Sequence, residues 1–194
     1  MDEFTFYLTK YGMYVLTGIV AFLVLRFIFS KTRKNYHSRW NTLIDNFEYS
    51  PKEFYALLKT ELESHGITKI NIKEKFIKEG GAMSHSRIYL RATWKDYQYD
   101  ICGAKFGHGF FVSWWLLYKD SIGKILVAKI PFIGGWLARK LYPVTYYRID
   151  TASMFMNYAQ SSVLKVIDDI TNNKGVRSIS EADRKPILND VFVR

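Results

Sequence analysis

The chain has 194 residues, 17% of them aromatic, and carries a formal net charge of +10 at pH 7. This length is enough for one domain with a buried core. The single cysteine, Cys102, excludes an intramolecular disulfide and a cysteine-rich zinc site, and the four histidines lack metal-ligand spacing. We therefore expect no metal and no cofactor.

The positive charge indicates an anionic partner. A basic domain held at a membrane most simply faces anionic lipid headgroups, although a nucleotide or a nucleic acid would also suit the charge. Charge alone does not separate these alternatives.

The strongest signal in the sequence is an apolar run over residues 11–30, where Arg26 is the only charged residue. A helix of about 20 residues rises roughly 30 Å, the thickness of the hydrocarbon core. The acidic start and the absence of a small-residue cleavage site disfavour a signal peptide. The lack of a polar stripe disfavours a buried helix of a soluble core. We predict a transmembrane helix over residues 11–30, preceded by an extracytoplasmic stub at residues 1–10.

The orientation follows from the basic residues after this run. The positive-inside rule places the N-terminus outside and the C-terminal part in the cytoplasm, which predicts a single-pass protein of the inner membrane. Anionic headgroups would attract the basic collar. The membrane contacts predicted here are Arg26, Lys31, Arg33 and Lys34.

Residues 31–49 are predicted to form a basic juxtamembrane amphipathic segment. The apolar residues Trp40, Leu43, Ile44 and Phe47 have the spacing of one helix face. This helix could continue the transmembrane helix, lie flat on the membrane, or dock one apolar face on the domain.

A second helix is predicted to begin at Pro51. Ser50 is placed to cap it, Pro51 suits the first helical position, and Glu53 would complete a capping box. Gly66 is expected to end it in the left-handed conformation.

The predicted fold class is α+β: an N-terminal single transmembrane helix, then a cytoplasmic domain at residues 50–175. Alternating apolar and polar residues, separated by Gly or Asp turns, predict an antiparallel β-meander of about four to five strands packed by helices. A long helix follows, and residues 176–194 are expected to dock as a tail. The strands are placed at residues 68–78, 87–95, 97–106, 110–118 and 144–149.

Residues 122–142 are apolar but interrupted by charges. They are expected to be an interfacial or re-entrant membrane element, or else a pair of short core helices with solvated lysines. A second full span is disfavoured because each lysine at the bilayer centre costs about 2.5–3.5 kcal/mol. The membrane contacts predicted here are Lys124, Lys129, Trp136, Arg139 and Lys140.

Two constellations could carry chemistry or binding. Cys102 with His108 or Asp100 could form a nucleophile, but His108 occupies a Gly-His-Gly turn, so a small buried thiol is the expected state and no catalytic residue is assigned. Cations and aromatics alternating on one strand face suit stacking and phosphate binding, or are ordinary cross-strand pairs. The ligand-binding residues predicted on this basis are Arg87, Tyr89, Arg91 and Tyr99.

Together these signals predict a membrane-anchored cytoplasmic binding or effector protein. It would act at the inner membrane through a protein partner or a small anionic ligand. A second interfacial contact at residues 122–142 and homo-oligomerisation are both compatible with the sequence. The alternatives are a structural subunit of a larger membrane complex and a membrane-tethered enzyme using Cys102.

Overall fold

The computed structural model describes residues 11–20, 22, 36–78 and 86–189. The chain divides into two compact units. One comprises Met1–Arg33 with Asp120–Val144, and the other comprises Lys34–Lys119 with Thr145–Arg194. The second of these, called here the α/β unit, contains the sheet and the long helices.

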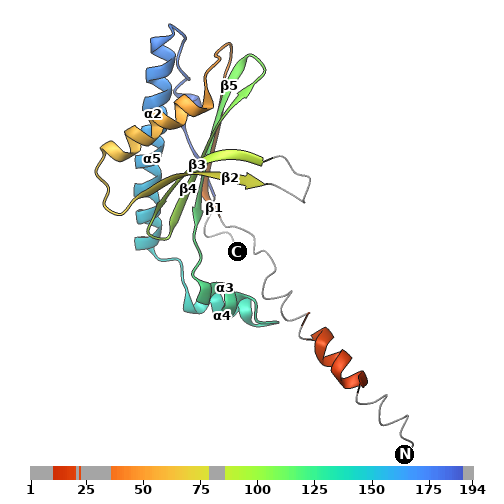
Figure 1. Ribbon diagram of the computed structural model, residues 1–194. Helices are drawn as coiled ribbons and strands as arrows, with labels where there is room; N and C mark the ends of the chain where they lie inside the picture. The colour runs from red at the N-terminus through yellow and green to blue at the C-terminus, as the bar shows by residue number, and fades with distance from the viewer. Residues whose placement is uncertain (1–10, 21, 23–35, 79–85, 190–194) are drawn as a thin grey trace, which may run out of the picture. The chain divides into compact units, whose positions relative to one another are not determined.

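The α/β unit is built on a six-stranded antiparallel sheet with the strand order β2-β3-β4-β5-β1-β6. Strands β2 to β5 form a meander, while β1 pairs with β5 and thereby brings an early segment beside a late one (Figure 1). The strands are β1 Tyr36–Ile44, β2 Asn71–Lys78, β3 Ser86–Trp94, β4 Tyr97–Phe106, β5 Gly109–Tyr118 and β6 Ile187–Leu188.

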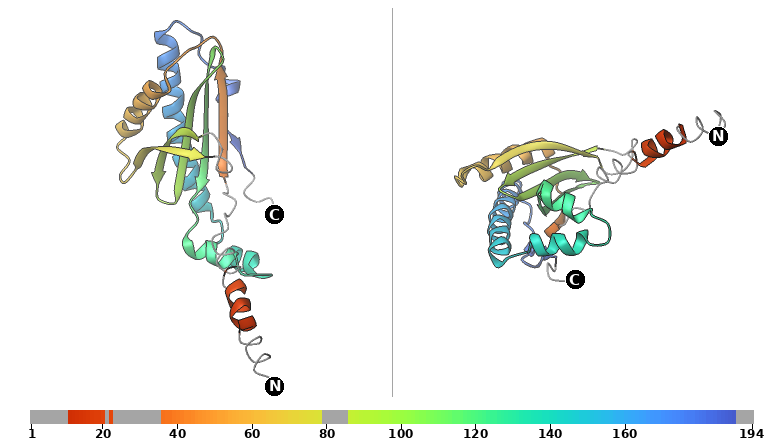
Figure 2. Two further views of the ribbon diagram at one scale, coloured as in Figure 1. Left: turned by 45° about the vertical axis from the view of Figure 1, so that its right-hand side comes forward. Right: turned by 90° about the horizontal axis from the view of Figure 1, so that it is seen from below.

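Two helices, α2 (Pro51–Ser64) and α5 (Tyr146–Asn173), cover the same face of this sheet (Figures 1 and 2). Both contact β4 and each other. Fully buried side chains such as Leu58, Ile101 and Val163 fill the space between the helices and the sheet. Burial of this apolar area is the main stabilising contribution to the unit. The opposite face of the sheet is called the second face below.

Helix α2 begins at Pro51, as predicted, but Ser50 makes no capping hydrogen bond through its side chain. Pro51 explains the start, because its missing N–H is one that a first turn leaves unbonded anyway. Past the other end of the helix, Gly66 has a φ of 64°, in the left-handed region that glycine adopts without strain.

The pairing of β3 with β4 runs from Trp94 and Tyr97 to Leu90 and Ile101. Past that last pair the two strands separate. The hydroxyl of Tyr55 on α2 bridges the two strands next to that point. It accepts a hydrogen bond of 2.9 Å from the Gly103 N–H and donates one of 2.8 Å to the Ile88 carbonyl. One side chain therefore supplies the hydrogen bonding that the diverging strands no longer exchange.

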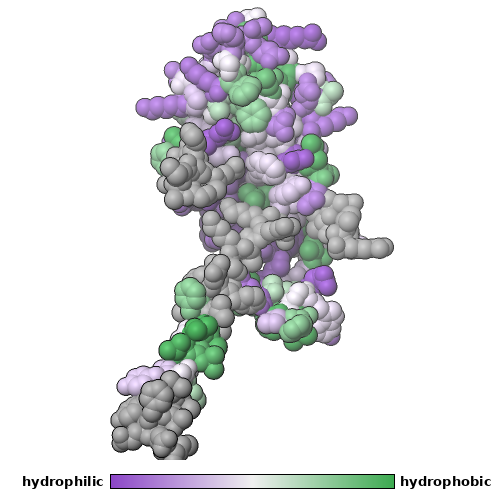
Figure 3. Space-filling view, turned by 90° about the vertical axis from the view of Figure 1, so that its right-hand side faces the viewer, coloured by the Kyte–Doolittle hydropathy of each residue, from purple (hydrophilic) through white to green (hydrophobic). Residues whose placement is uncertain are grey.

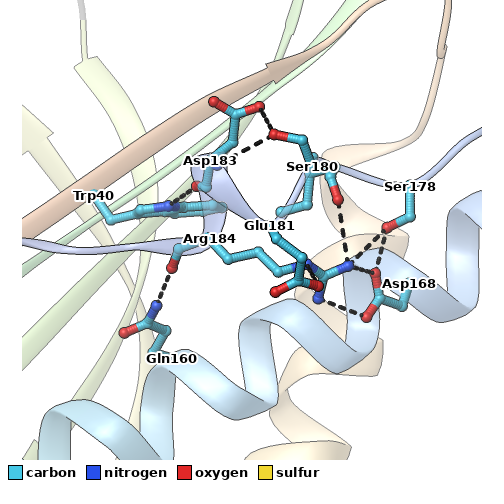
Figure 4. Close-up of polar contacts among 9 residues, drawn as sticks. Trp40, Gln160, Asp168, Ser178, Ser180, Glu181, Asp183 and Arg184 are labelled. Atoms are coloured by element: carbon cyan, nitrogen blue, oxygen red, sulfur yellow. Dashed lines mark hydrogen bonds and ion pairs between the residues drawn. The ribbon is translucent and has the colours of Figure 1, made fainter.

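The segment after α5 is held against α5 and β1 by a polar cluster (Figure 4). The Arg184 guanidinium donates to both carboxylate oxygens of Asp168, at 3.0 and 2.7 Å, and Ser178 also donates to Asp168. The Trp40 indole donates to the Asp183 carbonyl, and Gln160 donates to that of Arg184. This cluster joins β1, α5 and the C-terminal segment.

The prediction of a transmembrane helix over residues 11–30 is wrong. Residues 11–20 and 22 are helical, and residues 21 and 23–30 lie outside the described residues. Within the described part of the chain, no helix is long and apolar enough to cross a bilayer. The predicted single-pass topology depends on this helix and is therefore contradicted as well.

Two further elements differ from the predictions. Residues 36–44, within the predicted amphipathic helix, are strand β1, because Ser38, Trp40 and Ile44 also fit a two-residue alternation toward the core. The strand predicted at residues 144–149 is instead the start of α5, which Thr145 caps by accepting a hydrogen bond from the Arg148 N–H.

Candidate functional site

Residues 122–142 form two short helices, α3 (Ile122–Ala128) and α4 (Gly134–Leu141), called here the α3–α4 hairpin. Ser121 caps α3 by accepting from the Lys124 N–H. The two helices approach closely at Gly134, where a Cβ atom would lie 2.6 Å from the Val127 carbonyl oxygen. Glycine is therefore required for the tight turn between them.

The α3–α4 hairpin leaves most of its large apolar side chains exposed. Helix α3 has no buried residue, and α4 buries only Gly134 and Ala138. Phe132, between the helices, is completely exposed and has a φ of 64°, which bulky residues rarely adopt. The other exposed apolar residues are Ile122, Leu126, Ile130, Ile133, Trp136 and Leu141.

Within the described residues, these apolar side chains are exposed rather than packed. A contiguous apolar surface on a small element marks a site of contact with a partner or a membrane. A strained, exposed residue such as Phe132 is also more typical of a functional site than of a scaffold position.

The charges of residues 120–144 are mostly positive, with four basic residues and one acid, Asp120. Lys124 pairs with Asp120 at 2.6 Å. The Lys140 ammonium lies 5.0 Å from the centre of the Trp136 ring, a cation–π contact that joins two of the predicted membrane contacts. Lys129 and Arg139 belong to the same compact unit, within Asp120–Val144. Arg26, Lys31, Arg33 and Lys34 lie outside the described residues.

The second face of the sheet carries three of the four predicted ligand-binding residues. Arg87, Tyr89 and Arg91 alternate on β3 with core residues such as Leu90, so they share the second face. Arg91 forms a bidentate ion pair with Asp100, at 2.6 and 2.9 Å, and Gln98 donates to the same carboxylate. Arg91 is therefore largely neutralised.

Tyr99 does not belong to that face, and its assignment to the ligand site was wrong. It lies opposite the buried Ala92, is itself completely buried, and stacks on Trp114 with ring centroids 4.8 Å apart. Burial raises the pKa of its hydroxyl well above the usual value. The alternation with Ile101, an evident core residue, is the signal that would have placed Tyr99 correctly.

Two basic residues that the sequence reasoning missed extend the second face onto β2. Lys73 lies opposite Arg91 and Lys75 lies opposite Tyr89. Residues opposite each other in an antiparallel pair share a face. Hydrophilic side chains predominate on this side of the α/β unit wherever the surface is coloured (Figure 3). Within the described part of the chain, no ion pair engages Lys73, Lys75 or Arg87.

The structure gives no support to a Cys102 nucleophile. Cys102 is completely buried on β4, and Asp100 is committed to Arg91. His108 is almost fully exposed in the β4–β5 turn, where its Nδ1 lies 3.8 Å from a Glu48 carboxylate oxygen. About 13 Å of strand separates Cys102 from Phe106, the residue at which that turn begins.

A groove of 470 Å³ lies along α2 and α5 and contains none of the predicted site residues. Its floor is apolar, with Leu57 and Ile170, and its walls include Glu61 and Lys174. Asp169 also lines the groove. Glu61 accepts from Lys165, which lowers the pKa of Glu61, and Lys174 donates to the Glu48 carbonyl. Neither of these two charges is therefore left over to bind a ligand.

Comparisons with known proteins add little. No protein-family model and no curated protein matches this chain. One solved structure, that of the protein TTHA0849 from Thermus thermophilus, aligns at 16% identity over 66% of this chain and 97% of its own, with a TM-score of 0.24. A TM-score this low carries no argument, so nothing is transferred from that protein.

Proposed function

We propose that this protein is a binding protein that acts at an anionic membrane surface through the α3–α4 hairpin. The observation that carries the proposal is the exposure of Phe132 and Trp136 on a hairpin whose charged residues are almost all basic. The hairpin would lie flat in the headgroup region, with apolar side chains directed toward the acyl chains.

The composition of the hairpin favours lipid over a protein partner. Tryptophan is enriched at the level of the headgroups, where its ring meets both apolar and polar surroundings. Lys140 already contacts the Trp136 ring, so the pair presents an apolar body with a positive charge beside it. Each basic residue near an anionic surface contributes about 1 kcal/mol. Apolar insertion adds a contribution that salt does not screen.

A fluorophore at the tip of the hairpin tests this proposal in the full-length chain. Cys102, which is buried, is replaced by serine, and an environment-sensitive NBD label is attached at Phe132→Cys. We expect a blue shift and increased emission with vesicles containing anionic lipid, largely retained at moderate salt. Phe106→Cys, at another exposed aromatic, on β4, is the control and should show no shift.

The label also separates lipid from other partners. An unchanged spectrum at position 132 with anionic vesicles would contradict the proposal. A shift that grows with protein concentration in the absence of vesicles would indicate self-association through the hairpin instead. Phe132→Asp with Trp136→Asp in the unlabelled chain should weaken binding of the hairpin without unfolding the protein, because both side chains are exposed.

A further inference from the structure

Strand β2 is an edge strand with an exposed surface. It pairs with β3 along its whole length, from Asn71 to Lys78, and stands at the end of the strand order. Among the described residues, no strand lies on its other side. The N–H and C=O groups of that side are available to pair with a further extended chain.

The side chains of β2 define what such a chain would meet. Lys73 and Lys75 lie on the second face, where Ile77 stands opposite Arg87 of β3, and both lysines and Arg87 are exposed. Phe76 lies on the other side of the strand and is 72% exposed. An added strand would therefore meet two lysines on one of its faces, and Phe76 together with the exposed Glu74 on the other.

A second copy of β2 does not satisfy this pattern. When β2 pairs antiparallel with itself around its middle, residues of the same face stand opposite each other. Either Lys73 then faces Lys75 of the other copy, or one of these lysines faces its own counterpart. Like charges directly opposite each other destabilise a strand pair. The lysines therefore oppose self-pairing, as edge lysines commonly do.

The same lysines select a partner of opposite charge. We propose that β2 accepts an extended acidic segment of a partner protein, which adds a seventh strand to the six-stranded sheet. Aspartate or glutamate at alternate positions of that segment lies opposite Lys73 and Lys75. Arg87 lies on the same face, on the neighbouring strand β3. An apolar residue on its other face packs beside Phe76. This surface belongs to the α/β unit and is independent of the proposed membrane contact.

The test uses fluorescein-labelled peptides that alternate valine with glutamate, and fluorescence anisotropy with the full-length protein. We expect saturable binding of the acidic peptide. Lys73→Glu with Lys75→Glu should weaken it about tenfold, as expected when two cross-strand ion pairs become like-charge pairs. The same variant should bind a valine–lysine peptide better than the unmodified protein does.

Two controls separate strand addition from general attraction to a basic protein. A valine–glutamate peptide with every backbone nitrogen methylated keeps its charge but has no N–H to donate along either edge, and should bind much more weakly. Lys52→Glu with Lys59→Glu makes the same charge change on exposed positions of α2 and should leave binding nearly unchanged. Equal binding of the methylated peptide, or equal losses in both charge-reversed proteins, would overturn the proposal.

Discussion

Replacing Tyr55 by phenylalanine should destabilise the α/β unit by removing one oxygen atom. The hydroxyl accepts a hydrogen bond from the Gly103 N–H and donates one to the Ile88 carbonyl where β3 and β4 diverge. It is part of a buried side chain. Each buried polar group that loses its partner costs about 1–3 kcal/mol. We therefore expect Tyr55→Phe to lower the free energy of unfolding by about 2–4 kcal/mol, measured by urea denaturation followed by circular dichroism.

Tyr99 provides the matched control, because its ring is equally buried but its hydroxyl has no hydrogen-bond partner among the described residues. Tyr99→Phe removes a group that is already unsatisfied, so stability should stay unchanged or rise by up to about 1 kcal/mol. Equal losses in the two variants would refute the reasoning, since the Tyr55 effect could then not be attributed to its hydrogen bonds. A loss with Tyr99→Phe alone would reveal a buried water bound to that hydroxyl.

Two other changes test local packing and charge. Gly103→Ala should cost about 1–3 kcal/mol, because the new Cβ would lie 2.7 Å from a ring carbon of Phe54; denaturation midpoints measure this, and an unchanged midpoint would contradict it. The Asp168 carboxylate accepts a hydrogen bond from Arg184, which lowers the pKa of Asp168. The ion pair therefore stabilises the fold at any pH above the unfolded-state pKa, and this stabilisation is lost as the pH falls through the lowered pKa. Asp168→Asn should therefore lose stability at neutral pH and show a smaller further loss below about pH 4 than the unmodified protein. Parallel pH profiles would count against this role.

The meander of the sheet is the part of the fold that local sequence signals locate best. Strands β3, β4 and β5 begin and end within one residue of the predicted ranges, because short turns at Lys95-Asp96 and at Gly107-His108 separate them. The β4–β5 turn contains Gly107 with a φ of 58°, as the glycine pattern indicates. In these strands the local preference and the tertiary environment agree.

Strand β1 shows why local signals fail elsewhere. Its spacing of Trp40 and Ile44 fits a helix and a strand equally well, and the deciding interaction is the pairing with β5, more than sixty residues away in the chain. The buried polar residues His37 and Ser38 further weaken the alternation. Nonlocal pairing of this kind cannot be obtained from a periodicity within one window.

The prediction of a transmembrane helix is contradicted in a different way. Hydropathy over residues 11–30 measures only how apolar a segment is, and within the described residues no helix is long and apolar enough to cross a bilayer. At residues 122–142, by contrast, the sequence left the interfacial and core alternatives open. The exposure of Phe132 and Trp136 supports the interfacial proposal, and exposure is a property of the folded chain.

The two proposed surfaces are separable because the α3–α4 hairpin is an insertion between β5 and α5. The ends of the insertion are already joined within the α/β unit: the Arg148 guanidinium lies 4.9 Å from the centre of the Tyr118 ring, and Tyr97 donates to the Arg148 carbonyl. Closing a surface loop costs little additional entropy as the loop lengthens. Exposed substitutions in the hairpin should therefore leave strand β2 intact, and charge reversal on β2 should leave the hairpin intact. A variant that impaired both membrane binding and peptide binding would mean that one folding defect, rather than two sites, explains the results.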